Sequence, residues 1–167
     1  NEAVAREHAA RQGLRLEDIP RIKGWGHRSA PLLLERKLAL SAEQPLLFPH
    51  AGKAMAEAVH RAGFSGLEDL DGLETHDCFT TSEYMAIDHF GITAPGESWK
   101  AVEEGWLEID GKIPINPSGG LIGAGHPVGA TGVRQLLDAH LQVTGQAGDY
   151  QVDNAKNVQT LNIGGSG

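Results

Sequence analysis

The sequence has one cysteine, few basic residues and no long apolar run, and each shortage excludes a class of protein. Because Cys78 stands alone, the chain cannot form an internal disulfide, which is usual for proteins of reducing compartments. The 14 basic residues are outnumbered by 22 acidic ones, and the net charge of −8 disfavours a general nucleic-acid-binding protein. No apolar run reaches the ~18 residues of a membrane span, and no basic-then-apolar leader opens the chain. We therefore expect a protein without a nucleic-acid partner or membrane span, located in the cytoplasm or, in a eukaryote, in the peroxisome.

The rest of the composition is that of a folded globular protein. Apolar residues make up 40% and charged residues 22% of the 167 residues, which suffice for one domain with a sizeable core. The sequence begins at Asn1 instead of Met and stops at Gly167 within a glycine-rich run. We expect residues 1–167 to be one domain of a longer protein, cut at both ends.

Helical and extended patterns alternate along the chain. Apolar residues at helical spacing predict a helix that ends at Gly63, and glycines also follow predicted helices at positions 13 and 91. Thr80 and Glu83 have the spacing of a capping box, and Asp110-Gly111 predicts the tight turn of a hairpin. The predicted helices cover 2–12, part of 29–49, 55–62, 80–90 and 133–141, and the predicted strands cover 19–25, 70–75 and 158–163. This alternation indicates a layered α/β domain.

The most informative stretch is the glycine-rich segment of residues 116–132, which reads NPSGGLIGAGHPVGATG. It predicts a loop with unusual backbone angles and close approach, followed by a helix with Pro127 at its head. His126 directly precedes that helix, whose positive end disfavours the imidazolium and keeps the ring neutral at neutral pH. A neutral imidazole can take a proton from a thiol or donate a hydrogen bond to an oxyanion. His126 is therefore a candidate catalytic residue.

Taken alone, this segment also fits simpler interpretations. Glycines serve loops that merely pack tightly, and a lone histidine is more often structural than catalytic. Gly123, Gly125 and Gly129 have a G-x-G-x-x-x-G spacing that would suit a nucleotide-binding loop. The preceding residues 112–117 contain two prolines, however, and make a poor central strand for such a loop.

A second candidate cluster is His76, Asp77 and Cys78. A single cysteine in an apolar setting is usually an inert core residue, and His76 beside Asp77 could serve as a structural hydrogen-bonding residue. Together with His126 these side chains could bind a metal, although zinc sites favour ligand pairs at short spacing and only one thiol is present. We expect no metal ion and no covalently bound cofactor.

Three blocks, in this order, resemble the signatures of thiolases. His76-Asp77-Cys78-Phe79 resembles the block that sterol-carrier-protein-type thiolases carry where other thiolases have Asn-Glu-Ala-Phe. Gly125-His126-Pro127 resembles the glycine-histidine-proline signature of the family. Residues 161–165 (LNIGG) resemble the terminal Cys-x-Gly block, with Asn162 in the cysteine position. The resemblance covers essentially the whole chain and corresponds to the second half of a thiolase.

This resemblance implies a reaction and assigns roles to residues. Thiolases make or break the carbon–carbon bond of a 3-ketoacyl-CoA by way of an acyl-cysteine. The nucleophilic cysteine belongs to the amino-terminal half, which is absent here. By resemblance His126 would activate that cysteine and polarise the thioester oxygen, and His76 would complete this oxyanion site. Cys78 would be the second acid/base, near the substrate Cα.

Further roles follow from the same resemblance. The backbone N–H of Gly164 would bind the other oxyanion, and Asn116 and Gly125 would contact the substrate. Asn162 has no proton to exchange near neutral pH, so it cannot serve as the acid/base of the terminal block. The thiol of Cys78 would compensate for that replacement.

The resemblance also implies a fold and partners. Thiolases consist of two similar α/β halves that pack into five layers, and the protein dimerises. This chain would be one layered α-β-α half, with helices on both faces of a mixed sheet that lacks a last strand after Gly167. We expect a coenzyme A thioester as substrate, the amino-terminal half as partner, and a homodimer or tetramer. An isolated half should expose apolar surface and self-associate.

Three functions follow from these patterns. The first is the carboxy-terminal half of a thiolase, an acetyl-CoA C-acyltransferase that is inactive as an isolated chain. The second is a non-catalytic thiolase-like subunit that binds acyl-CoA or serves assembly. The third is a nucleotide-binding module. The pair of His126 and Cys78 favours the first.

Overall fold

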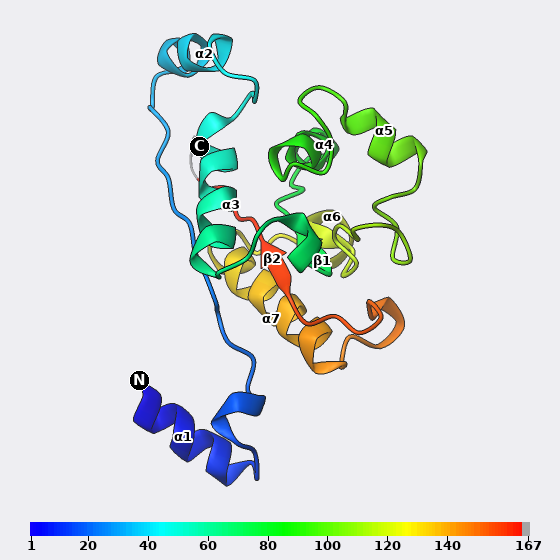
Figure 1. The fold of residues 1–167 in the computed structure, drawn as a ribbon. Coiled ribbons are helices and arrows are strands. Elements are labelled where there is room, and N and C mark those ends of the chain that lie inside the picture. Colours follow the sequence, from blue (N-terminus) through cyan, green and yellow to red (C-terminus); the bar gives the residue numbers. More distant parts are fainter. Residues whose placement is uncertain (165–167) are drawn as a thin grey trace.

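A small parallel sheet lies between helices on its two faces (Figure 1). The computed structural model describes residues 1–164. Strand β1 (Gly72–Glu74) pairs in parallel with β2 (Val158–Thr160), and Leu73 also forms a parallel bridge with Ile115. The α/β class is confirmed. Within the described residues every strand pair is parallel, so the antiparallel strand that a mixed sheet requires is not among them.

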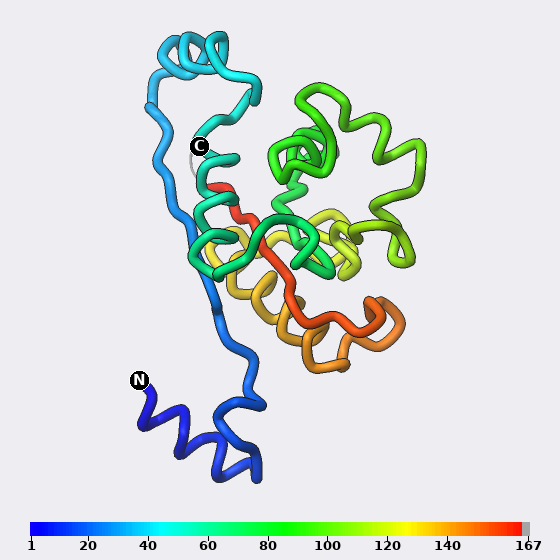
Figure 2. The backbone as a smooth tube through the Cα atoms, viewed as in Figure 1, coloured from blue at the N-terminus to red at the C-terminus, as the bar shows by residue number. Residues whose placement is uncertain are grey.

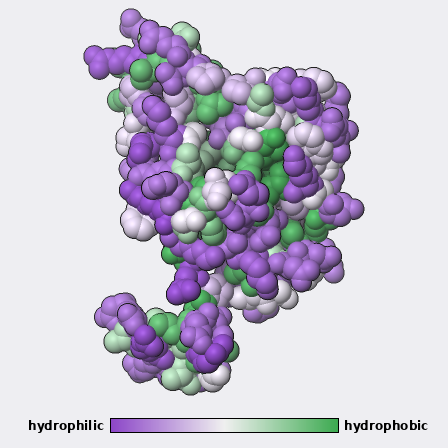
Figure 3. Space-filling model, viewed as in Figure 1, coloured by the Kyte–Doolittle hydropathy of each residue, from purple (hydrophilic) through white to green (hydrophobic). Residues whose placement is uncertain are grey.

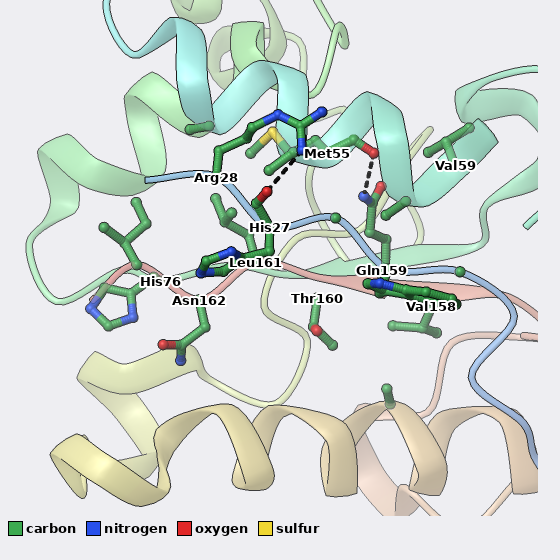
Figure 4. A pocket seen from close by; sticks show the side chains of 18 of the residues that line it. His27, Arg28, Met55, Val59, His76, Val158, Gln159, Thr160, Leu161 and Asn162 are labelled. Atoms are coloured by element: carbon green, nitrogen blue, oxygen red, sulfur yellow. Dashed lines mark hydrogen bonds between the residues drawn. The ribbon is translucent and has the colours of Figure 1, made fainter. Parts of the chain in front are cut away.

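The two faces of the sheet are covered by the two longest helices. Helix α3 (Pro49–Arg61) is joined to β2 by a hydrogen bond from Gln159 Nε2 to Met55 O of 3.1 Å. Helix α7 (Thr131–Thr144) lies on the opposite face of the sheet (Figure 4). There Gln135 Nε2 donates to Leu161 O at 3.1 Å. This arrangement confirms the expectation of helices on both faces.

The other helices surround this centre. They are α1 (Glu2–Arg11), α2 (Leu34–Ala42), α4 (Thr80–His89), α5 (Ser98–Glu103) and α6 (Gly120–Ala124), with 3-10 turns at Leu16–Asp18, Leu67–Asp69, Val128–Ala130 and Gly148–Tyr150. The helices predicted from sequence are confirmed. Gly13 and Gly63 follow α1 and α3 in the left-handed conformation, at φ +69° and +77°, as expected of glycines that end helices.

The strand predicted over 19–25 is wrong. This segment belongs to an extended stretch, residues 19–31, which we call the strap; it runs beside α3 and connects α1 with α2 (Figure 2). A Cβ at Gly24 would lie 2.1 Å from Ala58 O, and one at Gly26 would lie 1.8 Å from Ala54 O. The glycines therefore let the strap backbone abut the helix, so it packs against α3 and not within the sheet.

Three finer predictions are also wrong. Phe79, not Thr80, is the N-cap of α4, and Glu83 bonds to Asn116 instead of to the helix start. The turn at Asp110-Gly111 joins no strands in the described chain, although two backbone hydrogen bonds connect its arms. Pro127 heads a 3-10 turn instead of a helix, and α7 begins only at Thr131.

Helix α7 turns a polar stripe toward the sheet. Thr131, Gln135, Asp138 and Gln142 are all buried, whereas Val133, Leu136 and Leu137 are 71%, 45% and 54% exposed. An apolar stripe at this spacing ordinarily faces a core. Here the core lies on the other side of the sheet and contains Met55, Leu73, Ile87, Phe90, Ile113 and Ile115.

Candidate functional site

Two histidines from distant parts of the chain are in contact at one end of the sheet. His76 follows β1 and is 6% exposed, and His126 comes from the glycine-rich segment. Their ring centroids lie 4.9 Å apart with the planes at 89°, an edge-to-face contact. Burial lowers the pKa of His76, the neighbouring His126 lowers it further, and Asp77 acts in the opposite direction. His76 is therefore neutral at neutral pH.

His76 also presents an unsatisfied polar atom. Its Nδ1 is buried and has no hydrogen-bond partner within residues 1–164. A buried polar group without a partner costs about 1–3 kcal/mol, so such groups are uncommon in folded proteins. This unpaired buried atom makes His76 a candidate for a functional role.

A large groove brings together three of the six predicted site residues, His76, Cys78 and Gly164. It has a volume of about 1270 Å³, lies between the strap, α3, β2 and α7, and is bordered by His76, Cys78, Asn162 and Gly164. Figure 4 shows His76 and Asn162 on neighbouring segments at one end of this groove. Cys78 is half-buried, with its Sγ 3.8 Å from Ser82 Oγ. His126 joins this group through its contact with His76.

Asn116 and Gly125 occupy a different position. Neither borders the groove. Asn116 Oδ1 accepts from Thr75 N at 2.7 Å and its Nδ2 donates to Glu83 Oε2 at 2.9 Å, so both amide atoms are engaged within the protein. Gly125 has φ +101°, a conformation that favours glycine. Their role in substrate binding stays a prediction, and the observed contacts show that Asn116 ties two segments together.

One buried and one half-buried carboxylate hold the glycine-rich segment in place. Glu74 accepts from Ser118 Oγ at 2.8 Å, and Glu83 accepts from Asn116. Burial raises the pKa of Glu83, as does the nearby Asp77, whereas the hydrogen bond from Asn116 lowers it. The sequence contained one signal for these contacts: an acidic residue within a short apolar strand, at position 74, needs a buried partner.

Two polar residues of α7 hold the other side of the site. His126 Nδ1 and Thr131 Oγ1 lie 2.6 Å apart, and Thr131 is completely buried. One turn later Gln135 accepts from Asn162 Nδ2 at 3.1 Å, so the Asn162 amide is fixed by a hydrogen bond. Sequence reasoning missed both residues, because threonine and glutamine on a helix usually face solvent.

The described residues also limit other functions. No group of three or more His, Cys, Asp or Glu side chains is arranged to bind a metal ion in residues 1–164. Each helix of the described chain is too short or too polar to pass through a lipid bilayer. The arrangement can thus supply two imidazoles, one thiol and backbone N–H groups to a ligand at the groove.

Known proteins are similar to this chain in sequence and in fold. The chain is 46% identical over 99 residues to an acetyl-CoA acetyltransferase of Methanothermobacter thermautotrophicus, covering 59% of this chain and 26% of the relative. An acetyl-CoA acetyltransferase of Methanocaldococcus jannaschii is 31% identical over 98% of this chain and 42% of the relative. Human sterol carrier protein 2 is 38% identical over 76% of this chain and 24% of the relative. The chain therefore spans less than half the length of these relatives.

A solved structure supports the fold. The protein named Ltp2-ChsH2(DUF35) aldolase superposes with a TM-score of 0.65 over 86% of this chain and 37% of that chain, at 22% sequence identity. The family described as "Thiolase C-terminal domain-like" matches residues 34–167. This match covers both histidines and the thiol of the site. The chain belongs to the thiolase family, as a carboxy-terminal domain.

Proposed function

We propose that this chain is the carboxy-terminal half of an acyltransferase that makes or cleaves 3-ketoacyl-CoA by Claisen chemistry. The observation that carries the proposal is the contact between His76 and His126 beside a groove that Cys78 and Gly164 also border. Acetyl-CoA acetyltransferases among the relatives support a coenzyme A thioester as the substrate. The direction of the reaction and the acyl chain length are outside this proposal.

In this proposal His126 has two tasks, and His76 and Gly164 have one each. The nucleophilic cysteine comes from an amino-terminal half outside this chain, and His126 takes its proton as the thiolate attacks the thioester carbonyl. His76, whose buried Nδ1 has no partner in residues 1–164, stabilises the oxygen of that carbonyl with His126. The backbone N–H of Gly164 serves the oxyanion of the second half-reaction.

Cys78 has the remaining acid/base role. It exchanges a proton with the substrate Cα, so that the carbon–carbon bond can form or break. The amide of Asn162 cannot do this, and its bond to Gln135 gives it a fixed orientation. The half-buried thiol at the edge of the groove is the group that can exchange a proton there.

The assembly is part of the proposal. Because the relatives are more than twice as long as this chain, we propose that residues 1–167 pair with an amino-terminal thiolase half, and that the whole protein is a homodimer or tetramer. The isolated chain is then inactive. A cytoplasmic or, in a eukaryote, peroxisomal location also belongs to the proposal.

Two substitutions in the protein joined to its amino-terminal half test these roles. Cys78→Ala should abolish deuterium exchange at the Cα of acetyl-CoA while single-turnover acylation of the nucleophile continues. His126→Ala should slow acylation itself, by about 10²–10⁴-fold for the loss of an acid/base group. His8→Ala, an exposed histidine of α1, is the control and should change neither rate.

Two results would contradict the assignment. Wild-type Cα exchange in the Cys78 variant removes Cys78 from the mechanism, and wild-type acylation in the His126 variant removes His126. If the protein binds acetyl-CoA but neither reaction occurs, the second candidate, a non-catalytic subunit that binds acyl-CoA or serves assembly, takes its place. Asn162 in the position of the family's cysteine is the observation that favours this second candidate.

A further inference from the structure

A buried carboxylate connects the two segments that carry the site histidines. Asp77 follows His76 directly in the sequence and is only 2% exposed. Its Oδ1 accepts a hydrogen bond from Leu121 N at 2.6 Å, and its Oδ2 accepts one from Ile122 N at 3.5 Å. Both donors belong to α6, the short helix that directly precedes Gly125 and His126. One carboxylate thus links the residue beside His76 to the helix before His126.

Gly120, which lies next to the Asp77 carboxylate, makes this contact possible. Gly120 has φ +61°, a conformation that a side chain disfavours. A Cβ at this position would lie 2.2 Å from Asp77 Oδ2 and 2.7 Å from Oδ1. The carboxylate therefore fills the space that a side chain at position 120 would need, and the two residues are complementary in shape.

From these contacts we infer that Asp77 is a positioning residue, whose carboxylate holds α6 so that His126 contacts His76. The inference rests on the proposed function for its catalytic meaning, because it assigns Asp77 to the placement of the two proposed catalytic imidazoles. Asp77 does not border the groove, so it acts through its neighbours and not on the substrate.

The charge and geometry of Asp77 explain why another residue would not replace it. Charge-assisted hydrogen bonds to a carboxylate are stronger than those to a neutral acceptor. An asparagine has one carbonyl oxygen and one NH₂ group, so in Asp77→Asn one of the two backbone N–H groups would face a donor. We expect this variant to release α6 and to separate the two rings.

A matched pair of glycine substitutions tests the contact between Asp77 and α6 without changing the charge of Asp77. Gly120→Ala forces α6 and the carboxylate apart without changing the charge of Asp77, whereas Gly123→Ala, in the same helix, adds a Cβ that meets nothing within 4 Å. His126 now lowers the pKa of His76. NMR titration of this chain should therefore show the pKa of His76 rising in Gly120→Ala and unchanged in Gly123→Ala.

Nuclear Overhauser contacts between the two rings provide the direct measurement. They should be present in the wild-type chain and in Gly123→Ala, and lost in Gly120→Ala and Asp77→Asn. Circular dichroism checks that each variant is folded; should Gly120→Ala fail to fold, Asp77→Asn carries the test. Ring contacts that persist in a folded Asp77→Asn variant would overturn the inference.

Activity separates this inference from the proposed function. In the protein joined to its amino-terminal half, Asp77→Asn should lower kcat for acylation about 10²-fold, the effect of a misplaced catalytic group, with little change in KM. Lost ring contacts with an unchanged kcat would mean that the link exists but the histidines do not catalyse. Retained ring contacts with a reduced kcat would mean that Asp77 acts in some other way, and the inference would be wrong.

Discussion

At the scale of single residues, the hydroxyl of Thr131 is the contact that orients His126. It lies 2.6 Å from His126 Nδ1 and is buried, so one nitrogen of the ring has a fixed partner. Which nitrogen carries the proton in a histidine is set by such a partner.

We expect Thr131→Val, which keeps the shape and removes the hydroxyl, to slow acylation by about tenfold or more, in line with the 10–100-fold effects of removing the partner of a functional histidine. Thr131→Ser should restore the rate. Thr144→Val is the control, because the Thr144 hydroxyl bonds to His140 O on the same helix and is far along α7 from the site. Equal rates for the Val and Ser variants would show that the hydroxyl has no role.

Sequence patterns located the reactive residues of the site but not those that hold them. His76, Cys78, His126 and Gly164 were expected from local blocks. The structure places three of them at one groove and His126 in contact with His76. Their catalytic roles are still predictions. The supporting contacts depend on which segments meet in space, as when Asp77 bonds to Leu121, 44 positions away. No local pattern contains that information.

At the scale of elements, the strap shows why an extended segment need not be a strand. Its backbone packs against α3, and Arg61 of α3 adds side-chain contacts. Arg61 Nη1 donates to Trp25 O at 2.9 Å, and the Arg61 guanidinium lies 4.7 Å from the Trp25 ring centroid. Arg28 and Arg61 both pair with Glu57. The pattern of residues 19–25 predicted extension correctly, whereas the choice of partner depended on two glycines.

Substitution at one of these glycines should detach the strap. In Gly26→Ala the new Cβ would lie 1.8 Å from Ala54 O, so strap and helix must separate. We expect the Trp25 ring, already 64% exposed, to lose its contact with the Arg61 guanidinium, measured as the loss of nuclear Overhauser contacts between the two side chains. Gly129→Ala, whose Cβ would meet nothing within 4 Å, should leave these contacts unchanged. Contacts between Trp25 and Arg61 that persist in Gly26→Ala would contradict the packing described for the strap.

Helix α7 illustrates the limit of periodicity. The pattern of Val133, Leu136, Leu137 and Leu141 predicted the helix correctly. The apolar stripe is nevertheless turned away from the sheet, because the opposite stripe makes specific hydrogen bonds: Gln142 Oε1 accepts from Val152 N at 2.8 Å and Gln135 Nε2 donates to Leu161 O. Periodicity shows that a helix has two faces but not which partner each face meets.

At the scale of the whole molecule, one buried acid should make stability depend on pH. Burial raises the pKa of Glu74 from 4.5 to about 7, while Ser118 and Arg134 lower it and Asp138 raises it. The folded protein then holds a proton that the unfolded chain has lost, so stability is fully present below pH 4.5 and falls as the pH rises to about 7.

The free energy of unfolding should fall by about 3 kcal/mol over this pH range, at ~1.4 kcal/mol for each unit by which the pKa of Glu74 is raised. Urea unfolding across this pH range measures it. Glu74→Gln, which cannot ionise, should flatten the decline and leave the variant more stable than wild type at alkaline pH. The same decline in both proteins would place its origin in another group.

The surface suggests how the isolated chain behaves in solution. Figure 3 shows apolar side chains collected in the middle of one face, among mostly hydrophilic surroundings. The outward stripe of α7 adds Val133, Leu136 and Leu137 to the exposed apolar surface. Contiguous apolar surface of this kind promotes association.

We therefore expect the chain to form oligomers at high concentration, and Leu137→Gln to reduce them. Sedimentation velocity measures the distribution of species. Val4→Gln is the matched control, because Val4 is similarly exposed, at 57%, on α1 and away from this stripe. A monomeric wild-type chain, or equal effects of the two substitutions, would contradict the expectation.

The inward face of α7 has a consequence for how the two ends of the site keep their spacing. Thr131 contacts His126, and Gln135, one turn later, contacts Asn162. The helix therefore fixes the spacing between these two residues. A shift of α7 by one residue would replace Thr131 and Gln135 by other side chains at these contacts, and both hydrogen bonds would be lost. Intermediate positions of α7 would lack these hydrogen bonds. The spacing between the contacts to His126 and Asn162 therefore corresponds to one helical turn.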